Sequence, residues 1–427
     1  MAEHSVAEVY LWGEQIGAVA WDSNRQYATF AYTDKFARTG LQPSPLLMPT
    51  DGGRKKRFTF TNLNRDTFAG LPGMLADSLP DRFGNAMIDV WLAKEGRTNI
   101  NPVEKLLYMG SRGMGALEFR PAIRSATSRA VPIDMPGIIE LANQVMQAKG
   151  ELQVSSNDND ALNAILQIGT SAGGARPKGI VAINSKTKEI ISGQAAIPIG
   201  FDHWIIKFDG ITDMELGEPK QFGRIEFAYY LMAKASGIDM IECDLWEESG
   251  RAHFMTRRFD RANGGKIHMQ SLCALAHYDF NRARAYSYSQ ALLATMRITK
   301  LQKDIEELYR RMVFNVLARN QDDHTKNISY LMDQTGAWML SPAYDLTYAH
   351  NPAGQWTNEH QMLVNGKSSG FTRKDLQVVG DEFHIRHSVI EKVETAVNNW
   401  PEYARLAGLN EDIVREIGNN HRTRLLE

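Results

Sequence analysis

The sequence predicts an α+β protein of two lobes, in which a β-rich N-terminal subdomain and an α/β lobe precede an all-helical C-terminal lobe. Three observations support this fold class. Short apolar runs separated by turn residues fill the first part, strand and helix patterns alternate in the middle, and helical periodicity dominates after Arg261. We therefore expect domains at residues 1–125, 126–258 and 259–427.

The β-rich subdomain begins with three strand candidates. Residues 9–12, 16–21 and 27–32 are apolar or aromatic, and Gly, Asp, Ser and Asn residues occupy the intervals between them. This pattern predicts a meander of three strands. A helix is expected at residues 81–94, with Asp81 as its candidate cap.

The α/β lobe opens with helical periodicity from residue 132 to residue 168. A glycine-rich segment, residues 169–179, then carries an arginine and a lysine into a strand candidate at 180–183. A second strand candidate at 204–208 leads to an amphipathic helix at 224–236. This alternation predicts a mixed sheet with helical connections.

A further strand candidate covers residues 252–259 and closes the α/β lobe. The C-terminal lobe is helical in pattern, except for a hairpin expected at residues 328–340 around the turn residues 333–336.

Composition and charge limit the kind of partner. Lys and Arg number 48 against 50 Asp and Glu, so the net charge is -2 over 427 residues. Because a chain with so small a net charge has no electrostatic attraction for nucleic acid or for a membrane surface, any DNA contact has to be local or supplied by a partner. Two cysteines, Cys243 and Cys273, are too few for a disulfide framework or a cysteine zinc site. Without a signal-peptide pattern or an apolar stretch of roughly 18 residues, a cytoplasmic protein with no membrane span is expected.

The densest polar cluster occupies residues 320–327, between a helical and a strand pattern. Asp322 and Asn327 are five positions apart (327 − 322 = 5), which is the Asp-to-Asn spacing of a kinase catalytic loop. This spacing lets a carboxylate accept a hydroxyl proton while a nearby amide oxygen binds Mg²⁺. A second carboxylate, Asp345, follows one hairpin later and is the expected principal Mg²⁺ ligand. Each residue alone is more easily a polar loop residue, but the ordered set favours phosphoryl transfer.

His324 lies inside the same cluster and has two possible tasks. It either orients Asp322 through a hydrogen bond or ligates a metal, and we favour the orienting role.

Lys207 occupies an otherwise apolar strand pattern, where an unpaired ammonium group would be costly to bury. Glu226, 19 residues later (226 − 207 = 19) in the first turns of the amphipathic helix, is the candidate partner. A strand lysine paired with a helix glutamate is the arrangement that places ATP phosphates in kinases. An exposed lysine on an edge strand is an equally simple explanation.

The glycine-rich segment lacks the residue order of a Walker loop. Gly173, Gly174 and Lys178 nevertheless offer flexible backbone amides and a cation, which form a plausible phosphate cradle. A glycine-rich turn with solvated charges is the alternative. Ser171 at the edge of this segment carries a hydroxyl that could itself be phosphorylated.

These segments together resemble the HipA family of serine/threonine kinases, the toxins of bacterial toxin–antitoxin modules. The resemblance extends over nearly the whole chain. It rests on the glycine-rich loop 171–178, the strand with Lys207, the run Arg258-Phe259-Asp260-Arg261, the loop 322–327, the run Pro342-Ala343-Tyr344-Asp345, and residues 44–49 and 115–119 near the N-terminus.

The resemblance implies a two-lobed protein-kinase-like fold that uses ATP and Mg²⁺. It assigns Asp322 as the catalytic base, Asn327 and Asp345 as Mg²⁺ ligands, and Lys207 as the phosphate-binding lysine.

Phe259 and Asp260 would, by the same resemblance, lie near adenine and ribose, and Ser171 would match the autophosphorylated serine of the family. Family members phosphorylate an aminoacyl-tRNA synthetase, often the glutamyl enzyme, which leads to growth arrest and persistence. A HipB-type helix-turn-helix antitoxin neutralises them and brings the complex to operator DNA.

Two other functions are compatible with the residues. Asp322, Asp323 and His324 could be metal ligands of a phosphohydrolase, with Asp345 as a further ligand. Alternatively the chain is a pseudokinase that keeps the fold and acts as a corepressor with an antitoxin. Transfer of phosphate from ATP to a protein, as against its release or no turnover, discriminates among the three.

Overall fold

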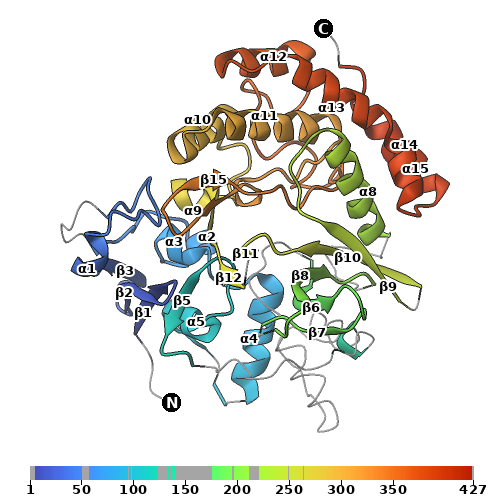
Figure 1. Ribbon diagram of the computed structural model, residues 1–427. Helices are drawn as coiled ribbons and strands as arrows, with labels where there is room; N and C mark the ends of the chain where they lie inside the picture. The colour runs from blue at the N-terminus through green and yellow to red at the C-terminus, as the bar shows by residue number, and fades with distance from the viewer. Residues whose placement is uncertain are drawn as a thin grey trace. The chain divides into compact units, whose positions relative to one another are not determined.

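The structure is a computed structural model that describes residues 5–50, 57–94, 96–97, 99–123, 133, 137–139, 176–194, 197–210, 221–248, 250–262 and 264–425. The chain divides into two compact units, each assembled from separate stretches of sequence. The first unit contains residues 1–42, 50–223 and 244–268, and the second contains residues 43–49, 224–243 and 269–427. Figure 1 shows the elements of both units.

The first unit begins with the predicted meander. Strands β1 (Val6–Leu11), β2 (Glu14–Asp22) and β3 (Tyr27–Tyr32) pair in antiparallel register within a sheet of order β4-β3-β2-β1-β5. Alternate residues of β1 are buried, as expected for a strand with one face on the core. The remaining elements here are α1 (Asp34–Ala37), β4 (Arg57–Phe58), α2 (Arg65–Phe68), α3 (Gly73–Ala76), α5 (Pro102–Met109) and β5 (Leu117–Arg120).

A second antiparallel sheet in this unit contains the strands predicted around Lys207. Its order is β7-β6-β8-β10-β9, with β6 (Lys178–Asn184), β7 (Ile190–Ser192), β8 (Phe201–Lys207), β9 (Cys243–Glu248) and β10 (Arg251–Arg257). Helix α4 (Arg82–Lys94) packs on this sheet, because Met87, Ile88 and Trp91 share one buried core with Val181 and Ile206. The short pair β11 (Arg261–Ala262) and β12 (Gly265–Lys266) follows.

Asp81 caps α4 as predicted, since its Oδ1 accepts a hydrogen bond from the backbone N–H of Gly84 at 2.7 Å. The helix predicted at residues 132–168 lies outside the described residues, apart from 133 and 137–139.

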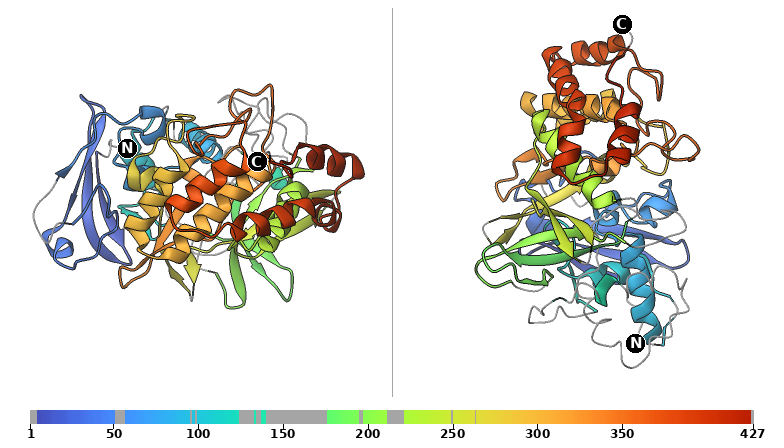
Figure 2. Two further views of the ribbon diagram at one scale, coloured as in Figure 1. Left: turned by 90° about the horizontal axis from the view of Figure 1, so that it is seen from above. Right: turned by 90° about the vertical axis from the view of Figure 1, so that its right-hand side faces the viewer.

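The second unit is mainly helical. Helices α10 (Tyr288–Thr299), α11 (Gln302–Leu317) and α13 (Ser388–Asn398) lie side by side, with α11 in contact with both others (Figure 2). Helix α11 is buried along most of its length. The other helices are α8 (Phe222–Ala235), most of which falls in this unit, α9 (Leu272–Ala276), α12 (Arg373–Glu382), α14 (Trp400–Leu406) and α15 (Glu411–Asn420).

The predicted hairpin is confirmed as β14 (Ser329–Met332) and β15 (Trp338–Leu340), which turn at Asp333. A third strand, β13 (His268–Ser271), extends this sheet, so the C-terminal lobe is not entirely helical. The sequence did not predict β13 because it has four residues and buries the polar side chains of His268 and Gln270. Within the described part of the chain, no helix combines the length and the apolar character that crossing a membrane requires.

Candidate active site

The predicted catalytic loop connects the buried helix α11 to strand β14. Its backbone is held by the segment near Ala349, which accepts from the N–H of Gln321 at 2.9 Å and donates to the carbonyl of Arg319 at 3.1 Å. A single 3-10 turn, η3 (Thr325–Asn327), completes the loop. The Thr325 hydroxyl donates to the carbonyl oxygen of Tyr278 at 2.6 Å. The loop therefore has a defined course between two buried elements.

Asp322 lies at the exposed side of this loop, with 41% of its side chain accessible. The indole Nε1 of Trp356 donates to its Oδ1 at 2.6 Å, and the Asn327 amide donates to its backbone carbonyl at 2.9 Å. His324 Nε2 is 3.7 Å from the same Oδ1, which is longer than a hydrogen bond. The structure thus gives the orienting contact, which we predicted for His324, to Trp356.

The sequence offered no signal for Trp356, which is 34 residues away in an irregular segment.

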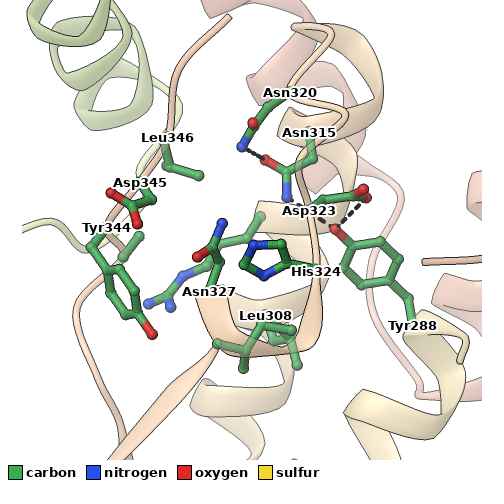
Figure 3. A pocket seen from close by; sticks show the side chains of 13 residues that line it. Tyr288, Leu308, Asn315, Asn320, Asp323, His324, Asn327, Tyr344, Asp345 and Leu346 are labelled. Carbon is green, nitrogen blue, oxygen red and sulfur yellow. Dashed lines mark hydrogen bonds between the residues drawn. The ribbon is translucent and has the colours of Figure 1, made fainter. Parts of the chain in front are cut away.

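Asp345, Asn327 and His324 line one pocket of the second unit (Figure 3). In the figure Asp345 and Tyr344 lie on one side of this pocket, and Asn327 and His324 lie between them and Asp323. Residues that are 18 positions apart in sequence (345 − 327 = 18) are therefore brought together around one space. Asp345 also has a positive φ of 53°, a left-handed conformation that costs most side chains free energy but that Asp tolerates.

The loop that carries Asp345 is tied to its neighbours on both sides. The backbone N–H of Leu340 donates to Asp304 on α11 at 3.0 Å, and Arg311 Nη2 donates to the carbonyl of Ser341 at 2.7 Å. The Tyr344 hydroxyl donates to the Lys326 carbonyl at 2.7 Å. Helix α11 and the catalytic loop thus fix the position of Asp345 together.

The pocket offers ligands of the type that Mg²⁺ prefers. The Asp345 carboxylate and the Asn327 amide oxygen are hard oxygen donors, and Mg²⁺ commonly uses one or two protein ligands together with water and phosphate oxygens. Buried polar atoms without a hydrogen-bond partner also line it, namely Asn320 Oδ1, His324 Nδ1 and Arg311 Nη1. Such atoms are costly unless water or a ligand satisfies them. The Asp345 carboxylate and the Asn327 amide oxygen therefore fit a hydrated Mg²⁺ ion, whereas the cationic Arg311 guanidinium group can only donate to water or to an anion.

Asp323 faces away from this role. Its side chain is fully buried, and its oxygens accept from the Tyr288 hydroxyl at 2.9 Å, His360 Nδ1 at 2.8 Å and the Gln361 backbone N–H at 2.8 Å. Burial acts to raise the pKa of Asp323, but the hydrogen bonds from His360, Gln361 and Tyr288 hold the pKa below its ordinary value.

Among the described residues, no group of three or more His, Cys, Asp or Glu side chains could hold a metal. The predicted phosphohydrolase ligand set of Asp322, Asp323 and His324 is therefore not assembled.

The two lysines predicted to bind phosphate are direct neighbours in the sheet of the first unit. Lys178 on β6 and Lys207 on β8 are cross-strand partners, and Phe254 on β10 continues the same row. Directly opposed residues on adjacent strands project from the same face, so two cations share one position on the sheet. Lys207 Nζ is 5.6 Å from the centre of the Phe254 ring. Glu226 belongs to the second unit, so its pairing with Lys207 stays a prediction.

Asp260 takes part in a buried network of ion pairs and hydrogen bonds. It is fully buried, and its Oδ2 accepts from Arg258 Nη2, Arg261 Nη1 and the backbone N–H of Gly115, each at 2.7 Å. Burial acts to raise the pKa of Asp260, but the two guanidinium groups hold this pKa well below its ordinary value. The network links residues 258–261 to residues near 115, so the structure gives Asp260 a task other than ribose binding.

Phe259 is half-buried in the adjoining turn, and its predicted adenine contact stays a prediction. Ser171, Gly173 and Gly174 lie outside the described residues.

Comparison with known proteins gives a consistent result. Residues 7–120 match the family model described as HipA N-terminal domain, and residues 170–417 match the one described as HipA-like C-terminal domain. A solved structure from Shewanella oneidensis, titled as a HipA, HipB and operator DNA complex, is similar over 97% of this chain and 95% of that chain, with a TM-score of 0.67 at 17% identity. At this identity, the likeness concerns the fold.

A protein of Sinorhizobium fredii named "Putative kinase Y4dM" is 27% identical over 155 residues. That match covers 34% of this chain and only 36% of the length of the relative.

Proposed function

Because the chain belongs to the HipA family, whose members are kinase-like proteins of toxin–antitoxin systems, we propose that it is an ATP- and Mg²⁺-dependent serine/threonine protein kinase. One observation carries this proposal. Asp345 and Asn327 line one pocket, and the loop that contributes Asn327 also carries Asp322, whose carbonyl the Asn327 amide contacts at 2.9 Å. A kinase needs a catalytic base on the same loop as one Mg²⁺ ligand, and a second Mg²⁺ ligand close to the first.

The proposed roles follow from the chemistry of each group. Asp345 and the Asn327 amide oxygen would hold Mg²⁺, which supplies charge neutralisation for the terminal phosphates of ATP. Asp322, aligned by Trp356, accepts the proton of the serine or threonine hydroxyl as the hydroxyl oxygen bonds to phosphorus and ADP leaves. The family resemblance supports a phosphate-binding role for Lys207, and its cross-strand partner Lys178 in the first unit would add a second positive charge. Catalysis then consists of positioning and electrostatic stabilisation, because phosphoryl transfer requires little covalent chemistry from the protein.

The substrate and partners are proposed from the family. We infer a protein target, with an aminoacyl-tRNA synthetase of the glutamyl type as the first candidate, and autophosphorylation at Ser171. The similar Shewanella structure is titled as a complex with HipB and operator DNA, which supports a HipB-like antitoxin as a partner here. Operator DNA would be reached mainly through that antitoxin, since the net charge of -2 gives this chain little attraction for DNA of its own.

The test is transfer of labelled phosphate. The purified protein is incubated with γ-labelled ATP, Mg²⁺ and cell extract, and mass spectrometry locates the label on a target or on Ser171. We expect Asp322→Asn and Asp345→Asn to lose transfer by about 100-fold or more while they remain folded, because each removes a group that acts on the reacting phosphoryl centre. Asp412→Asn is the matched control, because 87% of the Asp412 side chain is exposed on α15.

Transfer retained in the Asp345 variant would contradict the metal assignment. Nucleotide binding without any transfer would favour the pseudokinase, and release of free phosphate would favour the phosphohydrolase.

A further inference from the structure

The C-terminal tail returns to the catalytic loop after α15. The backbone N–H of Arg422 donates to the carbonyl of Leu317 at 2.8 Å, and its Nη1 donates to the carbonyl of Val316 at 2.7 Å. These carbonyls belong to the last turn of α11, which has no partners inside the helix. A cation is favourable at that end of a helix because the helix dipole is negative there. Arg422 therefore caps the helix from which the catalytic loop starts.

The same guanidinium group begins a buried chain of hydrogen bonds that ends at Asp323. Arg422 Nη1 is 3.0 Å from His360 Nε2, and His360 Nδ1 is 2.8 Å from Asp323 Oδ2. Arginine has donors only, so His360 Nε2 must be the acceptor and its Nδ1 must carry the hydrogen that Asp323 accepts. The histidine is therefore neutral, and Arg422 is the cation that balances the buried Asp323 carboxylate through it.

A second arm of Arg422 reaches the other side of the catalytic base. Its Nη2 donates to Gln321 Oε1 at 3.3 Å, and Arg319 Nη1 donates to the same oxygen at 3.1 Å. Gln321 and Asp323 are the immediate neighbours of Asp322. Both side chains that bracket the proposed base are thus connected to one residue of the tail.

We propose that Arg422 is a positioning residue for phosphoryl transfer, which fixes Asp322 by holding Gln321 directly and Asp323 through His360. This inference rests on the proposed kinase function. Residue 422 lies beyond residue 417, where the match to the HipA-like C-terminal domain ends. Arg422 is not a catalytic residue, because it touches neither of the proposed Mg²⁺ ligands nor Asp322 in the contacts described above.

The consequence of its loss follows from the charges. Without the guanidinium group, the Asp323 carboxylate stays buried beside a neutral histidine, and the last carbonyls of α11 lose their cap. The loop then relaxes, and the carboxylate of Asp322 shifts relative to the acceptor hydroxyl. A displacement of about 1 Å at a reacting group can lower the rate by roughly 100-fold.

The first test compares Arg422→Met with Arg422→Lys and with Arg424→Met, an exposed arginine of the same tail. We expect Arg422→Met to lower kcat by about 10- to 100-fold with less than a threefold change in KM for ATP, because the base is displaced while Asp345, which lies outside the loop, keeps its place. Lysine restores a charge but cannot make the three side-chain contacts, so it should rescue only part of kcat. Arg424→Met should leave kcat unchanged.

A merely structural role makes a different prediction. In that case Arg422→Met lowers the melting temperature, but the folded protein keeps its wild-type kcat, and the proposal is overturned. The single variant His360→Ala and its combination with Arg422→Met complete a double-mutant cycle. If Arg422 acts through His360, adding His360→Ala to Arg422→Met should lower kcat much less than His360→Ala lowers it in the wild type. Losses in log kcat that are fully additive would contradict this route.

Amide hydrogen exchange separates this inference from the proposed function. Arg422→Met should exchange faster than wild type at residues 319–327, while Arg424→Met should not, whether or not the protein transfers phosphate. Faster exchange in Arg422→Met, together with no phosphate transfer by the wild type, would contradict the kinase proposal and support the contact between the tail and the loop. Unchanged exchange at residues 319–327 would overturn the tail contact even in an active kinase.

Discussion

The buried carboxylate of Asp260 should stabilise the folded first unit, and removing its charge tests this. The perturbation is Asp260→Asn, which keeps the shape of the side chain and removes its charge. In the folded protein the Arg258 and Asp260 side chains are 2% and 0% exposed and 2.7 Å apart. Asparagine retains one acceptor oxygen, but its NH₂ group would face the guanidinium donors of Arg258 and Arg261, which would keep the backbone carbonyls of Gly113 and Gly115 as acceptors and lose the carboxylate charge.

The magnitude follows from this burial. Removing one partner of a buried ion pair costs about 3–5 kcal/mol, because the remaining charge is left without compensation. A matched control lies close by in sequence. Arg257 and Asp202 are 2.6 Å apart with 42% and 43% of their side chains exposed, and losing an exposed pair costs about 0–1 kcal/mol. Asp260→Asn should therefore destabilise the first unit several times more than Asp202→Asn.

Urea unfolding at pH 7 measures both variants, and the KM for ATP is measured in parallel at a temperature where each is folded. We expect Asp260→Asn to lower the urea midpoint by roughly 1–2 M, from a slope of about 2–3 kcal/mol per M, and to leave KM within about twofold. Equal midpoints for the two variants would refute the argument from burial. A large increase in KM with an unchanged midpoint would instead support the nucleotide contact that the family resemblance implies.

Three further outcomes can be measured with single variants. Trp356→Phe removes the 2.6 Å hydrogen bond to Asp322, so kcat should fall about tenfold in the phosphate-transfer assay, whereas an unchanged kcat would show that the bond does not orient the base. Tyr344→Phe removes the 2.7 Å bond to the Lys326 carbonyl, so a higher Mg²⁺ concentration should be needed for half-maximal transfer; the same Mg²⁺ titration as wild type would contradict this. Burial lowers the pKa of His421 to about 3 from its ordinary 6.5, so between these values the unfolded chain binds a proton that the folded protein does not. The contribution of His421 to the unfolding free energy is therefore fully present above pH 6.5 and decreases as the pH falls toward 3. In urea unfolding at pH 7 and pH 5, His421→Phe should show a smaller difference in unfolding free energy between the two pH values than wild type.

The sequence predicted the long periodic elements well, for a physical reason. The strands β1 to β3, the helix α4 with its Asp81 cap and the hairpin β14-β15 each bury apolar side chains in a repeating pattern that local sequence records. β13 was missed because its buried residues are polar, and their burial depends on partners far away in the chain.

The candidate site divides in the same way. The set Asp322, Asn327 and Asp345 could be predicted because the first two are five positions apart and the third follows after one hairpin. The pocket is lined by the last two of these residues. Trp356, His360 and Arg422 carried no signal, since each contacts the loop from a distance in sequence that only the fold closes.

Asp323 shows the limit of reading a polar cluster by composition. Two adjacent aspartates look equivalent in sequence, but one is 41% exposed and the other is sealed in a network of three donors.

The interleaved makeup of the two units has a consequence for how this protein is made. Residues 43–49 leave the ribosome early, yet the unit to which they belong also needs residues 224–243 and 269–427, which are translated much later. The early segment must therefore wait while almost all of the other unit is synthesised. For the same reason, a shortened protein that starts after residue 125 would still contain every proposed catalytic group, but its second unit would lack residues 43–49 and its first unit would lack the sheet β4-β3-β2-β1-β5.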